Sequence, residues 1–229
     1  MAKKIDKTEE RIHNVEETLS RTEHFIEQNQ KILINIGIAL VVIVLGFYAI
    51  RNYYILPREA DATAQMFMAQ KYFEKDSLKL ALNGDGNYPG FLQIIDEYKW
   101  TDASNLAHYY AGICFLKQGK FQNAIDQLKS FSSKDELVGP MGIGAIGDAY
   151  MELNQPDKAA GEYEKAANLR ENKFTTSLFL QKAAFAYEEM KNLDKALEIY
   201  EKIKTKYPNS LEAMDVDKYI AKIKTVQNK

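Results

Sequence analysis

A glycine-rich segment in the middle of the chain is the first place where residue spacing could support chemistry. In GIGAIGDAY, residues 142 to 150, Gly142, Gly144 and Gly147 follow the pattern G-x-G-x-x-G, by which dinucleotide-binding folds bring backbone N–H groups to a pyrophosphate. Such a site needs a strand before the glycines and an acidic residue about 20 positions later, at the end of a second strand. Here the segment follows Pro140 inside a helical pattern and leads into the helical stretch GEYEKAANL. We therefore expect glycines that serve helix packing, and no cofactor.

Three other groups of residues could carry chemistry, and each has a simpler structural explanation. Cys114 and His108 are six residues apart, which turns them to different faces of one helix, so they do not form a nucleophile and base. Asp85 in NGDGN lacks the spaced carboxylates of a calcium loop and predicts a turn. Glu188 and Glu189 diverge on a helix and fit a solvated face. We expect a non-enzymatic protein without a metal site.

The composition and charge of the chain exclude some classes of partner. The 229 residues are 46% hydrophobic and 27% charged, which is typical of a folded chain. Thirty basic and 32 acidic residues are mixed along the sequence and leave a net charge of -2, so no basic surface is predicted for nucleic acid. The single cysteine excludes an internal disulfide but does not define the redox compartment. We expect protein partners and neither nucleic acid nor a small-molecule substrate.

An apolar segment from Ile32 to Ile50 predicts a membrane anchor. It contains 19 residues without a charge, between Lys31 and Arg51, and as a helix it would extend about 28 Å, close to the thickness of a hydrocarbon core. The alternative is a buried helix of a globular domain, although such helices usually keep a polar stripe. A cleavable signal peptide is not expected, because 31 residues precede the segment and no small-residue cleavage site follows it.

The tail before the span, residues 1–31, predicts both a topology and an amphipathic helix. Its basic residues favour an N-terminus in the cytoplasm; they are Lys3, Lys4, Lys7, Arg11, Arg21 and Lys31. An apolar residue recurs every seven positions, at Ile5, Ile12, Leu19, Ile26 and Leu33. The companion heptad positions are mostly polar, so the stripe is narrow for a coiled coil. It fits a helix against a partner or the membrane surface, weak self-pairing, or a solvated helix.

The remainder of the chain, residues 57–229, has helical periodicity and internal repeats. Aligning Ala124, Ala159 and Ala196 places similar segments in register at spacings of 35 and 37 residues, which is the period of the tetratricopeptide helix-turn-helix unit. Twelve residues earlier in each unit stands a small residue, Gly112, Gly147 or Ala184, as close packing of two helices requires. The predicted fold is all-α: a single N-terminal transmembrane helix followed by a tetratricopeptide-repeat solenoid.

The repeat pattern also predicts boundaries. Repeats are expected at about 60–100, 105–138, 140–173 and 177–210, with a closing helix over 210–226. The first unit is degenerate, and we expect the loop at residues 82–90 to stretch its turn.

Repeat solenoids present a concave surface lined by the first helix of each pair. Repeat register predicts a groove lined by Leu106, Tyr109, Ile113, Met141, Gly144, Asp148, Leu178, Gln181 and Phe185. This lining is mostly apolar and lacks the Lys/Asn set that holds a terminal carboxylate, so an extended or helical apolar segment is the expected ligand. In an alternative arrangement the closing helix fills the groove and buries Val216, Ile220 and Ile223 there.

One N-terminal anchor followed by an arginine-aromatic edge and four repeats resembles the YfgM family, a membrane-anchored ancillary subunit of the bacterial Sec translocon. The resemblance covers about residues 30–225 and rests on this architecture and on stretches such as 107–131 and 147–167. It implies a bacterial inner-membrane protein with a periplasmic repeat domain. It further implies that this domain associates with the translocon and a membrane-anchored foldase and hands emerging chains to chaperones.

Three hypotheses follow from these patterns. The first is a non-enzymatic scaffold whose exported repeat domain binds translocon-associated foldases or emerging chains. The second is a structural assembly subunit that joins another cell-envelope complex through its tail and span. The third is a receptor of inverted topology whose repeats face the cytosol.

Overall fold

A computed structural model describes the backbone of residues 2–227 and the side chains of residues 26–227. The described backbone is helical with connecting turns and contains no strand, so the all-α prediction is confirmed. The chain divides into two compact units, Met1–Leu56 and Pro57–Lys229, and each is described by itself below.

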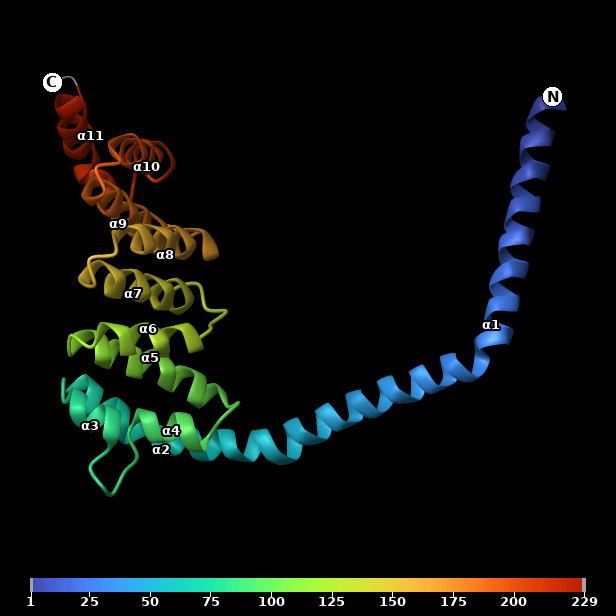
Figure 1. Cartoon of the computed structure of the whole chain (residues 1–229), viewed down its shortest axis with the longest axis horizontal. Helices are drawn as coiled ribbons and strands as arrows, with labels where there is room; N and C mark the ends of the chain where they lie inside the picture. The colour runs from blue at the N-terminus through green and yellow to red at the C-terminus, as the bar shows by residue number, and fades with distance from the viewer. Residues whose placement is uncertain (1, 228–229) are drawn as a thin grey trace. The chain divides into compact units, whose positions relative to one another are not determined.

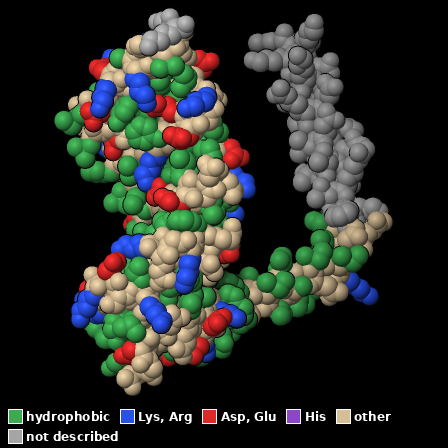
Figure 2. Space-filling view, turned by 60° about the vertical axis from the view of Figure 1, so that its left-hand side comes forward, with side chains coloured by type: hydrophobic (Ala, Val, Ile, Leu, Met, Phe, Trp, Pro, Cys, Tyr) green, Lys and Arg blue, Asp and Glu red, His purple; other side chains and the backbone are tan. Residues whose placement is uncertain are grey.

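The first unit is dominated by one long helix, α1 (Ala2–Ile50). It supplies the one stretch, within the described residues, that is long and apolar enough to cross a membrane. Every side chain from Ile32 to Ile50 is exposed, unlike those of a globular core helix, and the described part of α1 presents mostly apolar side chains (Figure 2). The heptad residues Ile5, Ile12 and Leu19 lie outside the described side chains, so the stripe stays a prediction.

A short π-helical turn, η1 (Arg51–Ile55), follows α1. Its wide hydrogen bond runs from the N–H of Leu56 to the carbonyl of Arg51. Pro57 comes next and cannot donate a backbone hydrogen bond, while its ring crowds the carbonyl four residues earlier. A local widening of the helix is a common response to such a residue.

The second unit consists of helices packed in sequence order, and Figure 1 shows them as successive antiparallel pairs. They are α2 (Leu56–Glu74), α3 (Leu78–Asn83), α4 (Phe91–Glu97), α5 (Asp102–Lys117), α6 (Phe121–Ser130), α7 (Val138–Glu152), α8 (Pro156–Leu169), α9 (Thr175–Glu189), α10 (Leu193–Lys206) and α11 (Ala213–Gln227). Helices α5, α7 and α9 each pack on the helix that follows, and the second helix of each pair packs on the next first helix.

The turn inside each helix pair has the same backbone structure. The first helix ends at a residue in the left-handed region, at Asp76, Gly119, Asn154 or Lys191, with φ of 54°, 72°, 56° and 60°. In the last turn the N–H of Asn192 donates to the carbonyl of Tyr187, and Lys191 donates to Glu188, both at 2.9 Å. These two bonds define a Schellman motif, and the other three turns form the equivalent bonds.

Small residues set the spacing of the paired helices, as predicted. A Cβ atom on Gly147 would lie 2.5 Å from Cε1 of Tyr163, and one on Gly112 would lie 2.5 Å from Cγ of Leu128. Both distances are shorter than packed carbon atoms allow. Gly147 therefore serves helix packing, and no strand precedes it, so the context of a dinucleotide site is missing.

The first repeat differs from our expectation. Its turn at residues 75–77 is short, and the loop at residues 84–90 instead divides the second helix into α3 and α4. The Asp85 carboxylate accepts the N–H groups of Asn87 and Tyr88 at 2.9 and 2.8 Å and the Tyr72 hydroxyl at 2.7 Å. These bonds, the Tyr72 bond first, lower the pKa of Asp85. The predicted turn is confirmed, but its place in the repeat was wrong.

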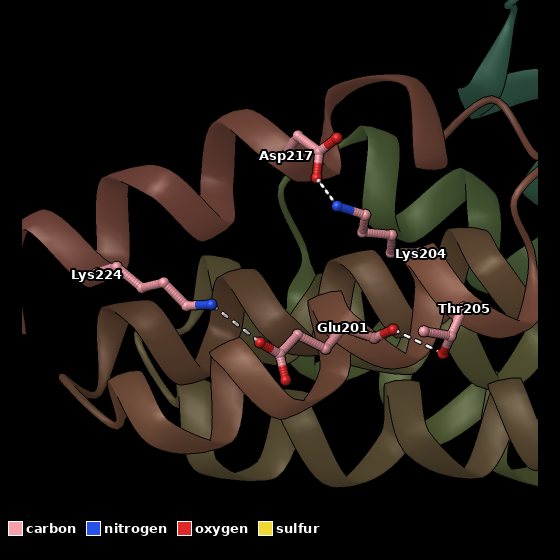
Figure 3. A network of polar contacts seen from close by, with 5 residues as sticks. All are labelled: Glu201, Lys204, Thr205, Asp217 and Lys224. Carbon is pink, nitrogen blue, oxygen red and sulfur yellow. Dashed lines mark hydrogen bonds and ion pairs between the residues drawn. The ribbon is translucent and has the colours of Figure 1, made fainter.

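Helix α11 closes the C-terminal end of the stack. Its Val216 and Ile223 are 0% and 1% exposed and belong to the apolar cluster formed with α9 and α10. Figure 3 shows the surrounding ion pairs, Lys204 with Asp217 at 2.6 Å and Lys224 with Glu201 at 3.2 Å. All four charged side chains are at least half exposed, and exposed pairs contribute about 0–1 kcal/mol each. The buried apolar residues therefore dominate the attachment of α11.

Replacing Gly147 with leucine tests the packing role of the small residue. We expect Gly147→Leu to overfill the space beneath Tyr163 and to lower the free energy of unfolding by about 1–3 kcal/mol or more, measured by thermal and urea denaturation. Gly161 is the matched control, since nothing lies within 4 Å of a Cβ added there. Gly161→Ala should raise stability by about 0.5–1 kcal/mol. Equal stability of the Gly147→Leu variant and the wild type would contradict the packing role.

The left-handed turn at Lys191 predicts a stabilising substitution. A side chain in this conformation costs about 1–2 kcal/mol relative to glycine, and the greater freedom of glycine in the unfolded chain offsets part of that. Lys191→Gly should therefore raise the free energy of unfolding by about 0.5–1 kcal/mol, and Gly119→Lys at the equivalent turn should lower it by a similar amount. Effects of the opposite sign in urea denaturation would show that these turns are not equivalent.

Candidate partner-binding groove

The first helices α5, α7 and α9 form the wall of the candidate groove. Helix α7 contacts both α5 and α9, so the three lie side by side. Each carries three of the nine residues predicted from repeat register: Leu106, Tyr109 and Ile113 on α5, Met141, Gly144 and Asp148 on α7, and Leu178, Gln181 and Phe185 on α9. Met141 and Phe185 are exposed at 42% and 36%. Gly144 is buried and the other six are half-buried.

Gly144 is a correction to the predicted lining. A Cβ atom on it would lie 1.9 Å from Cε1 of Phe179, so the ring of Phe179 on α9 occupies the space over this residue. Gly142 has a similar role, with Cδ1 of Phe131 at 2.9 Å from a Cβ added there. Gly142 and Gly144 thus admit aromatic rings of neighbouring elements of the same domain. Gly144 does not line an open surface.

The apolar lining residues on α5 are anchored in the core. Tyr109 packs against Phe131 and Tyr110, with ring centroids 5.2 and 5.7 Å apart, and burial raises the pKa of Tyr109. Ile113 packs against the buried cluster that contains Ile125 and Leu128. In this part of the candidate groove, only the outward-facing surfaces of Tyr109 and Ile113 are therefore available to a ligand.

Asp148 is the centre of a polar contact that joins three helices. Its carboxylate accepts the Tyr163 hydroxyl of α8 at 2.7 Å and pairs with Nζ of Lys182 of α9 at 2.7 and 3.0 Å. Burial of Tyr163, followed by its bond to Asp148, raises the pKa of this tyrosine. Lys182 comes 34 residues after Asp148, three residues short of the 37-residue spacing of these two repeats, so it lies about one helical turn before the position equivalent to Asp148.

A similar contact joins α9 and α10 to the closing helix, with its tyrosine 37 residues after Tyr163 and its acidic residue 40 residues after Asp148. Glu188 of α9 accepts the Tyr200 hydroxyl of α10 at 2.7 Å and pairs with Lys222 of α11, also at 2.7 Å and also 34 residues further on. The bond to Glu188 raises the pKa of Lys222. Helix α11 thus takes the place of a further first helix at the end of the stack.

This position bears on the alternative in which the closing helix fills the groove. Val216 and Ile223 are buried, and Ile220 is partly buried, against the cluster of α9 and α10. Among the predicted lining residues, Phe185 has a ring contact with α11, through Tyr219 at 5.3 Å between centroids. In the described contacts α11 therefore covers the C-terminal end of the groove, while Met141 stays exposed.

A hollow extends the groove beyond the predicted residues. It is lined by Leu116, Lys117, Gly119, Phe121, Asp148, Met151, Glu152 and Tyr163. Sequence reasoning missed Leu116, Lys117, Met151 and Glu152, although they stand three and four residues after Ile113 and Asp148 and so lie on the same helix faces. The hollow has charged and apolar side chains in its lining. On the face of the repeat domain that Figure 2 shows, charges of both signs are interspersed with apolar side chains.

Other residues considered for chemistry have structural partners. Cys114 is fully buried, and burial raises the pKa of its thiol to about 12, which disfavours the reactive thiolate. Nδ1 of His108 faces Oε1 of Gln127 at 2.8 Å. Within the described side chains, no group of three histidine, cysteine or acidic residues could hold a metal ion.

Comparison with known proteins agrees with the repeat assignment. Residues 106–135 and 179–210 match the tetratricopeptide repeat family, and these segments contain most of α5 with α6 and most of α9 with α10. No curated protein matches the chain. The chain is therefore an all-helical protein with tetratricopeptide repeats, preceded by an N-terminal helix that is long and apolar enough to cross a membrane.

Proposed function

We propose that the protein is a non-enzymatic, membrane-anchored scaffold whose repeat domain binds other proteins in the groove formed by α5, α7 and α9. The observation that carries the proposal is the partly exposed apolar lining, with Met141 and Phe185 accessible, in the same chain as an exposed 19-residue apolar helix segment. The lining favours an apolar segment of a partner, extended or helical.

The YfgM resemblance suggests which partners these are. In this proposal the protein is an ancillary subunit of the bacterial Sec translocon in the inner membrane, with its N-terminus in the cytoplasm and its repeats in the periplasm. The groove then receives a membrane-anchored foldase, a chaperone or an emerging exported chain. The basic tail supports this orientation.

A specific feature supports a second candidate function, a structural assembly subunit of another cell-envelope complex. The backbone of α1 is helical from Ala2, so the tail before the span offers a helical surface of its own. In that case partners are recognised by the tail and the span, and the groove is dispensable.

Topology is tested first, because the identity of the partner depends on the side that the repeats face. A reporter that is active only after export should be active when fused after Lys229 and inactive when fused before Met1. Six basic residues in the tail favour this orientation. The reverse pattern would contradict the translocon proposal and favour a cytosol-facing receptor.

Met141→Asp tests binding in the groove. Met141 is exposed, so the variant should keep its helical content and cooperative melting. It places a charge where an apolar segment would be buried, and an unpaired buried charge costs several kcal/mol. Capture of translocon components from gently solubilised membranes should therefore fail.

Lys165→Asp is the matched control, because Lys165 lies on the second helix α8 with its side chain 65% exposed. This variant should capture the same proteins as the wild type. If Met141→Asp folds and still captures them, recognition belongs to the tail or the span.

A further inference from the structure

Large exposed hydrophobic residues recur at one position in each repeat. Trp100, Leu137, Phe174 and Leu211 are 37 residues apart in each case, and their side chains are 77%, 47%, 76% and 80% exposed. We call these four residues the edge row. Neither the groove nor the apolar core of the repeats accounts for them.

All four stand where the chain enters a first helix. Trp100 precedes the N-cap residue of α5, Leu137 and Phe174 are the N-cap residues of α7 and α9, and Leu211 stands two residues before α11. Because the helices of each pair are antiparallel, the first helices all begin at the same edge of the stack. The edge row therefore follows this edge from repeat to repeat.

Local packing does not explain the edge row. A hydrophobic residue just before a helix often packs against the first turn, yet three of these side chains keep at least three quarters of their surface exposed. Trp100 also adopts a φ of 69°, a left-handed conformation that costs a bulky residue about 1–2 kcal/mol. The other described non-glycine residues with positive φ are Asp76, Asn154 and Lys191, at the turns inside the helix pairs, so Trp100 is the one large aromatic residue among them. Met214, in the first turn of α11, is exposed to the same 80% as Leu211.

The chain enters the repeat domain from the apolar segment at this same edge. The Glu59 carboxylate at the start of α2 accepts the N–H of Asp102 at 2.5 Å and of Ala103 at 3.0 Å, next to Trp100. Six residues, 51 to 56, separate Ile50 from Pro57, and six residues extend at most about 20 Å. A bilayer that holds the apolar segment must therefore lie near Trp100. The limit on this distance comes from the length of the connecting chain, so it holds for any orientation of the domain.

The chemistry of the edge row suits a bilayer surface. Tryptophan and other aromatic residues favour the interface between headgroups and hydrocarbon, and basic residues favour anionic headgroups. Lys99 adjoins Trp100 and Lys173 adjoins Phe174, so the two aromatic members of the row each have a basic neighbour, whereas Glu136 adjoins Leu137 and Glu212 adjoins Leu211. The acidic Asp135 near Leu137 accepts the N–H groups of Leu137 and Val138 at 2.8 Å. With one large apolar residue per repeat, the edge row extends along the stack and does not form a compact patch.

We propose that the edge row inserts into the interface of the membrane that holds the N-terminal anchor, so that the repeat domain rests on the bilayer along the edge where its first helices begin. This inference depends on the proposed membrane anchorage. In this arrangement the bilayer, rather than a protein, covers the exposed hydrophobic residues of the edge.

Trp100 is the only tryptophan in the chain, so its fluorescence tests the proposal without any substitution. The full chain is reconstituted in vesicles of phosphatidylcholine and phosphatidylglycerol, with and without a lipid that carries a nitroxide on its headgroup. We expect the nitroxide lipid to quench most of the Trp100 emission, and acrylamide in the water to quench little of it.

Three variants extend the test along the edge. In a Trp100→Phe background, tryptophan is introduced by Leu137→Trp, Phe174→Trp or Leu211→Trp, and each should also be quenched by the nitroxide lipid. Leu80→Trp in the same background is the control, since Leu80 is 39% exposed on α3, near the opposite ends of the first helices. It should keep its emission with the nitroxide lipid.

The outcomes separate the two proposals. If the chain does not float with the vesicles, it is not anchored in the membrane. Both the proposed function and the edge proposal are then contradicted. If the chain floats but Trp100 is not quenched, the edge proposal is overturned and the row is assigned to a protein partner, while the anchor stands. Quenching limited to Trp100 would follow from the tether alone and would also overturn contact along the edge.

Discussion

The two helices of each repeat can approach only because the first helix carries a small residue at their crossing. At Gly112 and Gly147 a single added methyl group would collide with Leu128 or Tyr163 of the second helix, and Ala184 is fully buried at the equivalent place. This spacing aligns successive first helices side by side. The proposed groove and the edge row both depend on that alignment, because each takes its residues from corresponding parts of successive first helices.

Polar contacts also link the stacked helices. The Asp148, Tyr163 and Lys182 contact and the similar contact of Glu188, Tyr200 and Lys222 each join three consecutive helices. The second of these contacts involves α11, so the closing helix ends the solenoid in the place of a further first helix.

The sequence predicted the helical repeats because packing leaves a pattern at fixed spacing, with Gly147 twelve residues before Ala159 and a ring three residues after each small position. It misplaced the loop at residues 84–90, because an interrupted second helix and a stretched turn leave the same local signals of glycine, proline and aspartate. It assigned Gly144 to the groove, because repeat register predicts only the helix face on which a residue lies. Register does not show that the large ring of Phe179, on the neighbouring helix, covers that residue. Register did not predict the Asp148 and Lys182 pair, because its 34-residue separation differs from the 37-residue spacing of these two repeats.

The central claim is that the groove of an anchored repeat domain binds a protein, and site-specific photocrosslinking in intact cells tests it most directly. A photoreactive amino acid is placed at Met141 or, as a comparison, at Lys165 on the outer helix α8 of the full chain. The account predicts adducts from Met141 with a translocon subunit, a membrane-anchored foldase or emerging exported chains, and none of these adducts from Lys165. Adducts with such proteins from positions in the tail at residues 2–31, with none from Met141, would contradict it.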